Sequence, residues 1–423
     1  MDLKFHPFSE KNKFGYYSVG QYNTYSKVDA IEVGDKLNLP VEWHFNDEVF
    51  DSIDWTVEPE PSLWELYTLR ARQLREKYDY LVLFYSGGAD SNNIFNSFVK
   101  NNIHLDEVVQ WTNYEVTGDK ENNWNAEVFK VAAPTTAKLI EDNNLKTKHR
   151  IVDMSKLLTT LDETIPDVEE WVYGKNSYFS PNMRATALMR KHTPEYQELI
   201  SQGKKVCFVW GCEKPMLVNS IDPNNKGTFV PTMVFQDRVD HCISVKDQVE
   251  NFDWVHDELF YWTPDLPLIV VKQCHTVANF FKTATPLSNP LTTDQQAWGS
   301  TVINGKTYFL TANGLNQLIY PYWNPDTFSI GKNPSVVFSA RDYWILQDNN
   351  PVQQMQMEAI RQTQKRVKDK WTGPKWGITH YHSPAYNLFP MPENKVVLGP
   401  YNTTVINNIR SRNVTLITPA SDK

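Results

Sequence analysis

The chain has 423 residues, 41% of them hydrophobic and 22% charged, and its formal net charge at pH 7 is -8. This composition is typical of globular proteins and argues against a disordered chain. The length is large for one core, so two substantial units are expected. The acidic balance gives no support for general binding to nucleic acid, which would need a positively charged surface.

Targeting and redox signals both favour a cytoplasmic location. Residues 1–6 contain no hydrophobic region of the signal-peptide kind. No stretch approaches the ~20 apolar residues that a membrane span requires, so no membrane association is expected. The cysteines lack C-x-x-C pairing and fit a reducing compartment rather than a disulfide framework. They are Cys207, Cys212, Cys242 and Cys274.

Residues 1–60 form a polar N-terminal extension, in which residues 15–20 and 40–45 are predicted as short strands. The next segment contains a capping box, because Glu65 follows Ser62 by three positions, and a helix is expected over about 62–77. Arg70 falls on the apolar stripe of this helix, so we expect its stem to pack there while its charge reaches solvent. The other inward residues are predicted to be Leu63, Leu66, Tyr67 and Leu74.

An apolar run over residues 80–85 predicts a buried strand of a parallel sheet. The run breaks into Ser86-Gly87-Gly88-Ala89-Asp90-Ser91 and restarts as a helical pattern over about 90–101. A strand, a glycine turn and a helix direct free backbone N–H groups at an anion, and the helix N-terminus adds partial positive charge. Ser86 and Ser91 supply hydroxyl donors, and Asp90 is placed to hold a metal ion that bridges phosphate oxygens. The competing interpretation is a glycine turn that binds nothing.

The loop lacks the spacing and the lysine of a Walker A motif. Ser86-Gly87-Gly88-Ala89-Asp90-Ser91 instead resembles the S-G-G-x-D-S signature of the PP-loop ATP pyrophosphatases at every fixed position. That family includes asparagine synthetase, GMP synthetase, NAD synthetase, tRNA-lysidine synthetase and 7-cyano-7-deazaguanine synthase. The resemblance, which covers residues 63–220, implies that the chain binds ATP with Mg²⁺, attaches AMP to a substrate oxygen and releases pyrophosphate.

Strands alternate with helices beyond the loop. Strands are predicted over residues 107–112, 148–153 and 205–210. Helices are predicted over about 123–143, restarting at Pro134, and over 181–192. This order predicts an α/β fold with a doubly wound parallel sheet, whose ligands bind beyond the carboxyl ends of the strands.

Two further strand ends are predicted to complete the ATP site. Gly211, Glu213 and Lys214 follow the strand over 205–210, and Lys214 is the best basic group for neutralising pyrophosphate; a solvated lysine is the alternative. Glu213 can act as a base or a second metal ligand, although a solvated carboxylate is the favoured interpretation. The resemblance implies that adenine lies at the end of the second strand, at Trp111 and Thr112. Trp111 can stack on the base, and a core tryptophan is slightly favoured.

Other charged and sulfur-containing residues receive weaker predictions. Arg184 and Lys191 can reach the phosphates from the preceding helix, but surface ion pairs are the favoured interpretation. Cys212 can be a nucleophile of the sulfur-transfer kind, but strand alternation turns Cys207 to the opposite face, so the two should not meet. The pairs His241-Cys242 and Cys274-His275 lack zinc-ligand spacing and are left unassigned as metal ligands.

The turn-rich residues 222–227 mark a predicted boundary. The expected division is an N-terminal extension over 1–60, a PP-loop ATP-binding domain over 61–220, and an aromatic-rich α+β region over 221–423 that shapes the acceptor pocket. In the last region a helix is predicted over about 351–370 and a strand near 395–398.

The expected function is an ATP-dependent ligase that adenylates an oxygen of a small-molecule acceptor for attack by a nitrogen nucleophile. Residue 2 is Asp and no cysteine precedes Cys207, so a glutaminase of the asparagine synthetase kind is not expected. The nitrogen must then come from ammonia, an amine or a partner glutaminase. Two alternatives are a sulfur-inserting or nucleobase- or tRNA-modifying relative, and a nucleotide-binding module without turnover.

Overall fold

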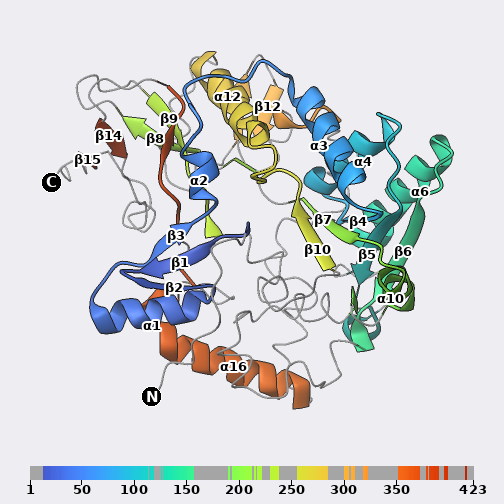
Figure 1. Ribbon diagram of the computed structural model, residues 1–423, viewed down its shortest axis with the longest axis horizontal. Coiled ribbons are helices and arrows are strands. Elements are labelled where there is room, and N and C mark those ends of the chain that lie inside the picture. The colour runs from blue at the N-terminus through green and yellow to red at the C-terminus, as the bar shows by residue number, and fades with distance from the viewer. Residues whose placement is uncertain are drawn as a thin grey trace.

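The fold is taken from a computed structural model (Figure 1). It describes residues 13–112, 114–118, 125, 127–156, 189–190, 193–211, 214–215, 217–221, 229–237, 255–283, 300–303, 306–309, 318–322, 351–371, 378–379, 381–389, 395–398 and 415–416. The helix predicted over 181–192 lies outside these residues, apart from 189–190, which are helical.

A five-stranded parallel sheet forms the centre of the α/β fold. Its strands are β4 (Tyr80–Phe84), β5 (Glu107–Thr112), β6 (Lys148–Asp153), β7 (Val206–Trp210) and β10 (Val255–Leu259). Their order is β10-β7-β4-β5-β6, and every neighbouring pair is parallel. The four strands predicted in this part of the chain are confirmed as β4, β5, β6 and β7. β10 was not predicted.

Among the described residues, six helices belong to this unit, of which α5 and α10 were not predicted and the others fall in predicted segments. They are α3 (Leu63–Lys77), α4 (Ala89–Val99), α5 (Tyr114–Thr117), the π-helix η1 (Glu127–Ala132), α6 (Ala133–Asp142) and α10 (Pro194–Ser201). The capping box is confirmed, since the Ser62 Oγ accepts from the Glu65 N–H while the Glu65 carboxylate accepts from the Ser62 N–H. Pro134 falls in the first turn of α6, as predicted.

Helices cover both faces of the sheet. Arg70 of α3 bonds to Glu258, which lies opposite Val209 in the ladder between β10 and β7. Tyr196 of α10 packs edge-on against Phe208, with 5.3 Å between ring centroids. Successive strand residues point to opposite faces, so α3 and α10 lie on different sides. This double cover explains why β4 and β7 are almost entirely apolar and buried.

Arg70 corrects one prediction, because its charge does not reach solvent. The side chain is 1% exposed, and its Nη2 donates to Glu258 Oε2 at 2.8 Å and to the Leu259 carbonyl at 2.9 Å. Glu258 lies on β10, beyond the expected end of the ATP-binding unit at residue 220. That predicted boundary therefore leaves out one strand of the central sheet. An interior arginine is tolerated here because it meets an opposite charge.

The N-terminal segment forms a small sheet in the order β2-β1-β3, built from β1 (Tyr16–Val19), β2 (Tyr22–Thr24) and β3 (Glu42–His44). Two of these strands, β1 and β3, fall in the segments predicted to contain them. The helices α1 (Lys27–Leu37) and α2 (Asp47–Phe50) were not predicted. His44 links β3 to α2, with its Nδ1 2.8 Å from Asp47 and its Nε2 2.7 Å from the Ser18 Oγ.

The described residues beyond the central sheet form two further sheets and two long helices. The first sheet has the order β13-β9-β8-β14-β15, and the second is the hairpin β11-β12. Their strands are β8 (Leu217–Ile221), β9 (Phe229–Met233), β11 (Ser300–Ile303), β12 (Lys306–Phe309), β13 (Tyr386–Asn387), β14 (Lys395–Leu398) and β15 (Thr415–Leu416). The helices are α12 (Leu268–Thr283) and α16 (Pro351–Val367), which continues as the 3-10 helix η4 (Lys368–Lys370).

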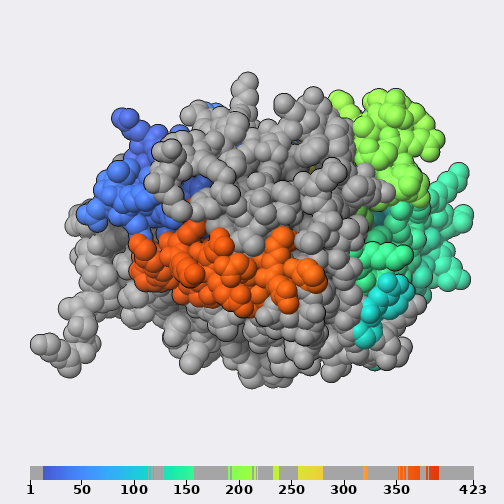
Figure 2. Space-filling view, turned by 90° about the horizontal axis from the view of Figure 1, so that it is seen from below, coloured from blue at the N-terminus to red at the C-terminus, as the bar shows by residue number. Residues whose placement is uncertain are grey.

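The N-terminal segment packs on downstream residues. α1 contacts α16, which lies across one face of the molecule (Figure 2). Arg366 of α16 donates to Asp29 at 2.7 Å and to Glu32 at 2.8 Å. In the interior, Phe45 packs against Phe235, with 4.9 Å between ring centroids. The predicted α16 and β14 are both confirmed.

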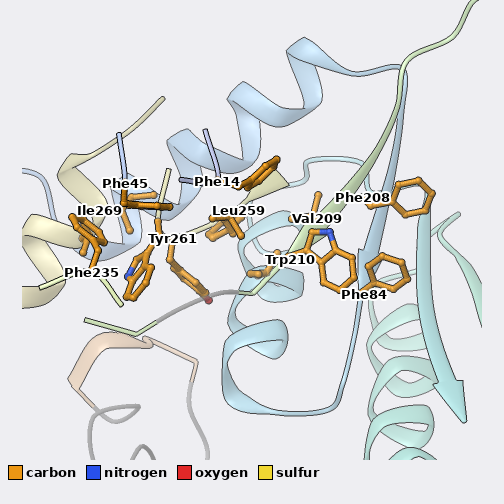
Figure 3. Packing of buried hydrophobic residues seen from close by; sticks show 14 of the residues in the cluster. Phe14, Phe45, Phe84, Phe208, Val209, Trp210, Phe235, Leu259, Tyr261 and Ile269 are labelled. Atoms are coloured by element: carbon orange, nitrogen blue, oxygen red, sulfur yellow. The ribbon is translucent and has the colours of Figure 1, made fainter. Parts of the chain in front are cut away.

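One continuous core joins these parts. Figure 3 shows Phe45, Phe235 and Tyr261 at one end of it, and Trp210 with Phe84 at the sheet. The high aromatic content of the chain therefore serves its interior at these positions, as aromatic side chains bury large areas. Within the described part of the chain, no helix is long and apolar enough to cross a membrane.

Candidate functional site

The candidate site lies at the carboxyl ends of β4 and β7. From β4 the chain continues to β5, which lies beside β4 on the side away from β7. From β7 the chain continues to β10, which lies beside β7 on the side away from β4. This reversal makes the junction between β4 and β7 the topological switch point of the sheet. Ligands of open α/β sheets bind in the crevice outside such a point. Residues 86–91, called the 86–91 loop, follow β4 after Tyr85 and run into the first turn of α4. They lie at this point together with Gly211, which follows β7.

The 86–91 loop has the backbone that its glycines predict. Gly87 has a φ of 78°, in the left-handed region, and Gly88 is the N-cap of α4. The Ser86 Oγ accepts from the Gly88 N–H at 3.2 Å, and the Ser91 Oγ donates to the Gly88 carbonyl at 3.2 Å. As a glycine N-cap, Gly88 makes no side-chain bond to the first turn of α4. Ser86 is exposed at the turn, while Ala89 and Ser91 are buried.

Gly87 also makes a close backbone approach. A Cβ added there would lie 2.8 Å from the Cβ of Ala132, at the end of η1. The turn therefore requires glycine for two reasons, its positive φ and its contact with η1.

Gly87→Ala should consequently destabilise the chain more than Gly203→Ala. Gly203 has nearly the same φ of 77°, but an added Cβ there meets nothing within 4 Å. Gly203→Ala should cost about 1 kcal/mol for the backbone alone. Gly87→Ala should cost about 1–3 kcal/mol more, because the new methyl group overlaps Ala132. Denaturant unfolding of both variants measures the difference, and equal losses would show that the contact with η1 contributes nothing.

Asp90 is bonded to three residues that lie far from it in the sequence. Its Oδ2 accepts from the Lys214 Nζ at 2.7 Å, and its Oδ1 accepts a short hydrogen bond from the Tyr320 hydroxyl. Its backbone carbonyl accepts from the Tyr261 hydroxyl at 2.8 Å. The carboxylate remains partly open, since the Asp90 side chain is 26% exposed and that of Lys214 is 18% exposed.

Two buried tyrosines thus belong to the site although neither was predicted there. Burial, together with the nearby Asp90 charge, raises the pKa of the Tyr320 phenol well above its ordinary value. Burial likewise raises the pKa of the Tyr261 phenol. Both phenols are therefore protonated donors at neutral pH. The aromatic runs that contain them are visible in the sequence, but separations of 171 and 230 residues from Asp90 conceal the contact.

Gly211 allows β7 to approach α4. A Cβ at this position would lie 3.2 Å from the Asp90 Cβ and 3.4 Å from the Ser91 nitrogen. A side chain here would press on the turn that carries the signature residues. Lys214 then returns toward the same turn and meets Asp90. Lys214 therefore lies beside the signature turn, and its role toward pyrophosphate stays a prediction.

Trp111 and Thr112 end β5, next to β4. The Trp111 ring is half-buried and packs edge-on against Phe84, with 4.8 Å between centroids. The Thr112 hydroxyl donates to the Asn125 Oδ1 at 2.8 Å, so it is engaged within the protein. Partial burial fits both a core tryptophan and a ring that stacks on adenine, so stacking stays a prediction.

Several predicted residues fall outside the described residues: Glu213, Cys212, Arg184, Lys191, His241 and Cys242. Cys207 and Cys274 are buried, and burial raises the pKa of each thiol. Neither is therefore a reactive thiolate. The His275 Nε2 lies 2.8 Å from the Trp55 carbonyl, so His275 joins α12 to the N-terminal segment. In the described part of the chain, no group of three or more His, Cys, Asp or Glu side chains is arranged to hold a metal ion.

The groups present are of the kinds that bind a nucleoside triphosphate with magnesium. Ser86 offers an exposed hydroxyl and Lys214 a partly exposed ammonium, while the Gly88 N–H and the Ser91 hydroxyl are bonded within the loop. Asp90 offers a carboxylate of the kind that Mg²⁺ uses when phosphate oxygens and water supply its other ligands. Comparison with protein-family models yields no match, and comparison with curated proteins yields none.

Proposed function

We propose that the chain is an ATP-dependent adenylating enzyme of the PP-loop ATP pyrophosphatase type. ATP and Mg²⁺ bind over the 86–91 loop, and the bond between the α and β phosphates breaks. AMP is attached to an oxygen of a small-molecule acceptor, and a nitrogen nucleophile then displaces AMP, as in asparagine-synthetase-like amidation. The observation that supports this most is the position of the whole signature at the switch point, with Lys214 2.7 Å from Asp90.

The residues of the site have separate roles in this proposal. The backbone at Gly87 and Gly88, with the hydroxyls of Ser86 and Ser91, binds the β and γ phosphates. Lys214 offsets the charge that develops on the departing pyrophosphate. Asp90 would hold the magnesium ion, which when bound supplies further charge stabilisation at the phosphates.

The second candidate is a nucleotide-binding module without turnover. One observation favours it, namely that both carboxylate oxygens of Asp90 already hold partners, Lys214 and Tyr320. A magnesium ion must share or replace one of them. A sulfur-inserting mechanism gains no support from Cys207, because that thiol is buried in β7 and its pKa is raised.

Acceptor-dependent release of pyrophosphate distinguishes these candidates. The native chain is incubated with ATP and Mg²⁺ together with separate pools of carboxylates, amino acids and nucleobases, each with and without ammonia. We expect one pool to stimulate formation of AMP and pyrophosphate in equal amounts. Bound ATP that no pool converts would favour the binding module, and formation of ADP with orthophosphate would contradict cleavage between the α and β phosphates.

A further inference from the structure

The two oxygens of the Asp90 carboxylate have chemically different partners. Oδ2 faces the Lys214 ammonium at 2.7 Å, whereas Oδ1 accepts from the neutral phenol of Tyr320. Lys214 can also interact with phosphate, since its ammonium is partly exposed and free to rotate about a flexible stem. A phenol has far less attraction for phosphate. A bound polyphosphate should therefore draw Lys214 away from Oδ2, whereas Tyr320 should stay bonded to Oδ1.

Tyr320 is fixed on Asp90 from two helices of the core. The Tyr67 hydroxyl on α3 donates to the carbonyl of Ile319 at 2.7 Å. Gln273 on α12 in turn donates to the Tyr67 hydroxyl at 2.9 Å. Tyr67, Gln273 and Ile319 are all buried. Because this chain of hydrogen bonds holds the backbone next to Tyr320, the phenol is directed at Oδ1 without help from a ligand.

Tyr261 holds the same turn from its backbone side. Its hydroxyl donates to the Asp90 carbonyl and accepts from the Asn93 Nδ2 at 3.1 Å. Its ring lies 5.4 Å from that of Tyr320, between centroids. The Lys214 ammonium lies 5.9 Å from the centroid of the Tyr320 ring. The aromatic pair therefore contacts both Asp90 and Lys214, from residues distant in sequence.

We propose that Tyr320 is a positioning residue, which holds Oδ1 of Asp90 so that Oδ2 is the oxygen presented to a magnesium ion. This inference rests on the proposed function, because it assigns Tyr320 to the same ATP site. Outer hydrogen bonds that orient a ligating carboxylate contribute substantially to metal affinity. The residues beyond 220 are accordingly part of the ATP site, and they do more than shape the acceptor pocket.

The test is Tyr320→Phe, with Tyr85→Phe as the matched control. Tyr85 is also a buried tyrosine whose hydroxyl donates to α4, but to Asn92 at 3.1 Å rather than to Asp90. Calorimetry measures binding of α,β-methylene-ATP over a series of Mg²⁺ concentrations. Tyr320→Phe should raise the Mg²⁺ concentration for half-maximal binding about 10–100-fold. Tyr85→Phe should change this Mg²⁺ concentration by no more than about twofold, because the Tyr85 hydroxyl bonds to Asn92 and not to the ligating carboxylate.

A second variant guards against a folding defect at Tyr320. Tyr67→Phe removes the bond to Ile319 without touching Asp90, and it should shift the Mg²⁺ dependence in the same direction by a smaller factor. Unchanged Mg²⁺ dependence in folded Tyr320→Phe would overturn the inference and leave the proposed function standing. Native protein that binds the analogue equally well without Mg²⁺, or not at all, would overturn the proposed function itself.

Discussion

Asp90→Asn should lower acceptor-dependent release of pyrophosphate by on the order of 10²–10³-fold, the loss typical when one charge-stabilising group is removed from a reaction centre. Asparagine keeps the shape and can still accept from Tyr320, but it has no charge for a magnesium ion or for Lys214. The measurement is the rate of pyrophosphate formation from ATP at saturating Mg²⁺ with the stimulating acceptor pool.

Asp153→Asn is the matched control for this experiment. Asp153 also ends a strand of the sheet, β6, and its Oδ1 accepts from the Ser155 N–H at 2.9 Å. Its loss should leave pyrophosphate release near the native rate, because the Asp153 carboxylate bonds to the backbone of Glu115 and Ser155 and not to the 86–91 loop. Stability should change by less than about 1 kcal/mol in Asp90→Asn, because the ion pair with Lys214 is partly exposed. Native rates in Asp90→Asn would contradict the proposed role of this carboxylate.

Arg70→Met should destabilise the protein by about 3–5 kcal/mol, because it leaves the buried Glu258 with one partner fewer in the interior. Arg70 and Glu258 are each 1% exposed at the side chain, and their atoms lie 2.8 Å apart. Methionine keeps much of the volume, so the loss measures the charge rather than a cavity. Urea unfolding monitored by tryptophan fluorescence measures the change.

Lys138→Met provides the comparison for Arg70. Lys138 and Asp142 also lie 2.8 Å apart, but their side chains are 74% and 50% exposed. Removing that pair should change the free energy of unfolding by no more than about 0.5 kcal/mol. If Arg70→Met were as mild as Lys138→Met, then the ion pair between α3 and β10 would not hold the edge strand of the sheet.

Acid should reduce the difference between the native chain and Arg70→Met. Burial by itself would raise the pKa of the Glu258 carboxyl, but the charges of Lys13 and Arg70, with hydrogen bonds from Lys13 and Tyr78, hold it well below its ordinary value of 4.5. A group with a lowered pKa contributes stability that is complete above its unfolded pKa and is lost as pH falls toward its folded one. The difference between the two unfolding free energies should therefore shrink below about pH 4.5, as unfolding at several acidic pH values would show.

The central strands and the signature loop could be predicted because their signals are local. β4 and β7 are continuous apolar runs, and Ser86 to Ser91 break the first of them with glycines. The capping box at Ser62 likewise fixes the start of α3 through contacts within one turn. Each of these features depends on residues that are neighbours in the chain.

β10 could not be predicted, because its sequence, Val-His-Asp-Glu-Leu, is polar for a strand in a covered sheet. Its carboxylates are neutralised from distant parts of the chain. Arg190 donates to Asp257 at 2.6 Å, and Arg70 donates to Glu258 at 2.8 Å. Nothing in the five residues of β10 themselves indicates that distant arginines will pair with these carboxylates. The charge of Arg70 was assigned to solvent for the same reason, since its partner lies 188 positions away.

The candidate site likewise has one part that could be predicted from local sequence and one part that could not. The 86–91 loop follows from its motif, and Lys214 follows from its place after a strand. Tyr320 follows Ile319, whose carbonyl is held by Tyr67 of α3, and Tyr261 reaches Asp90 from just beyond β10. Such contacts depend on tertiary packing, which an aromatic-rich composition indicates without specifying which residues meet.

The central claim is that ATP binds over the 86–91 loop in a form that requires Asp90. The most direct measurement is calorimetric titration of the native chain and of Asp90→Asn with α,β-methylene-ATP, which the proposed cleavage cannot consume, with and without Mg²⁺. We expect saturable binding to one site in the native chain that Mg²⁺ strengthens, and loss of that strengthening in Asp90→Asn. Absence of binding to the native chain, or the same Mg²⁺ dependence in both proteins, would contradict the claim.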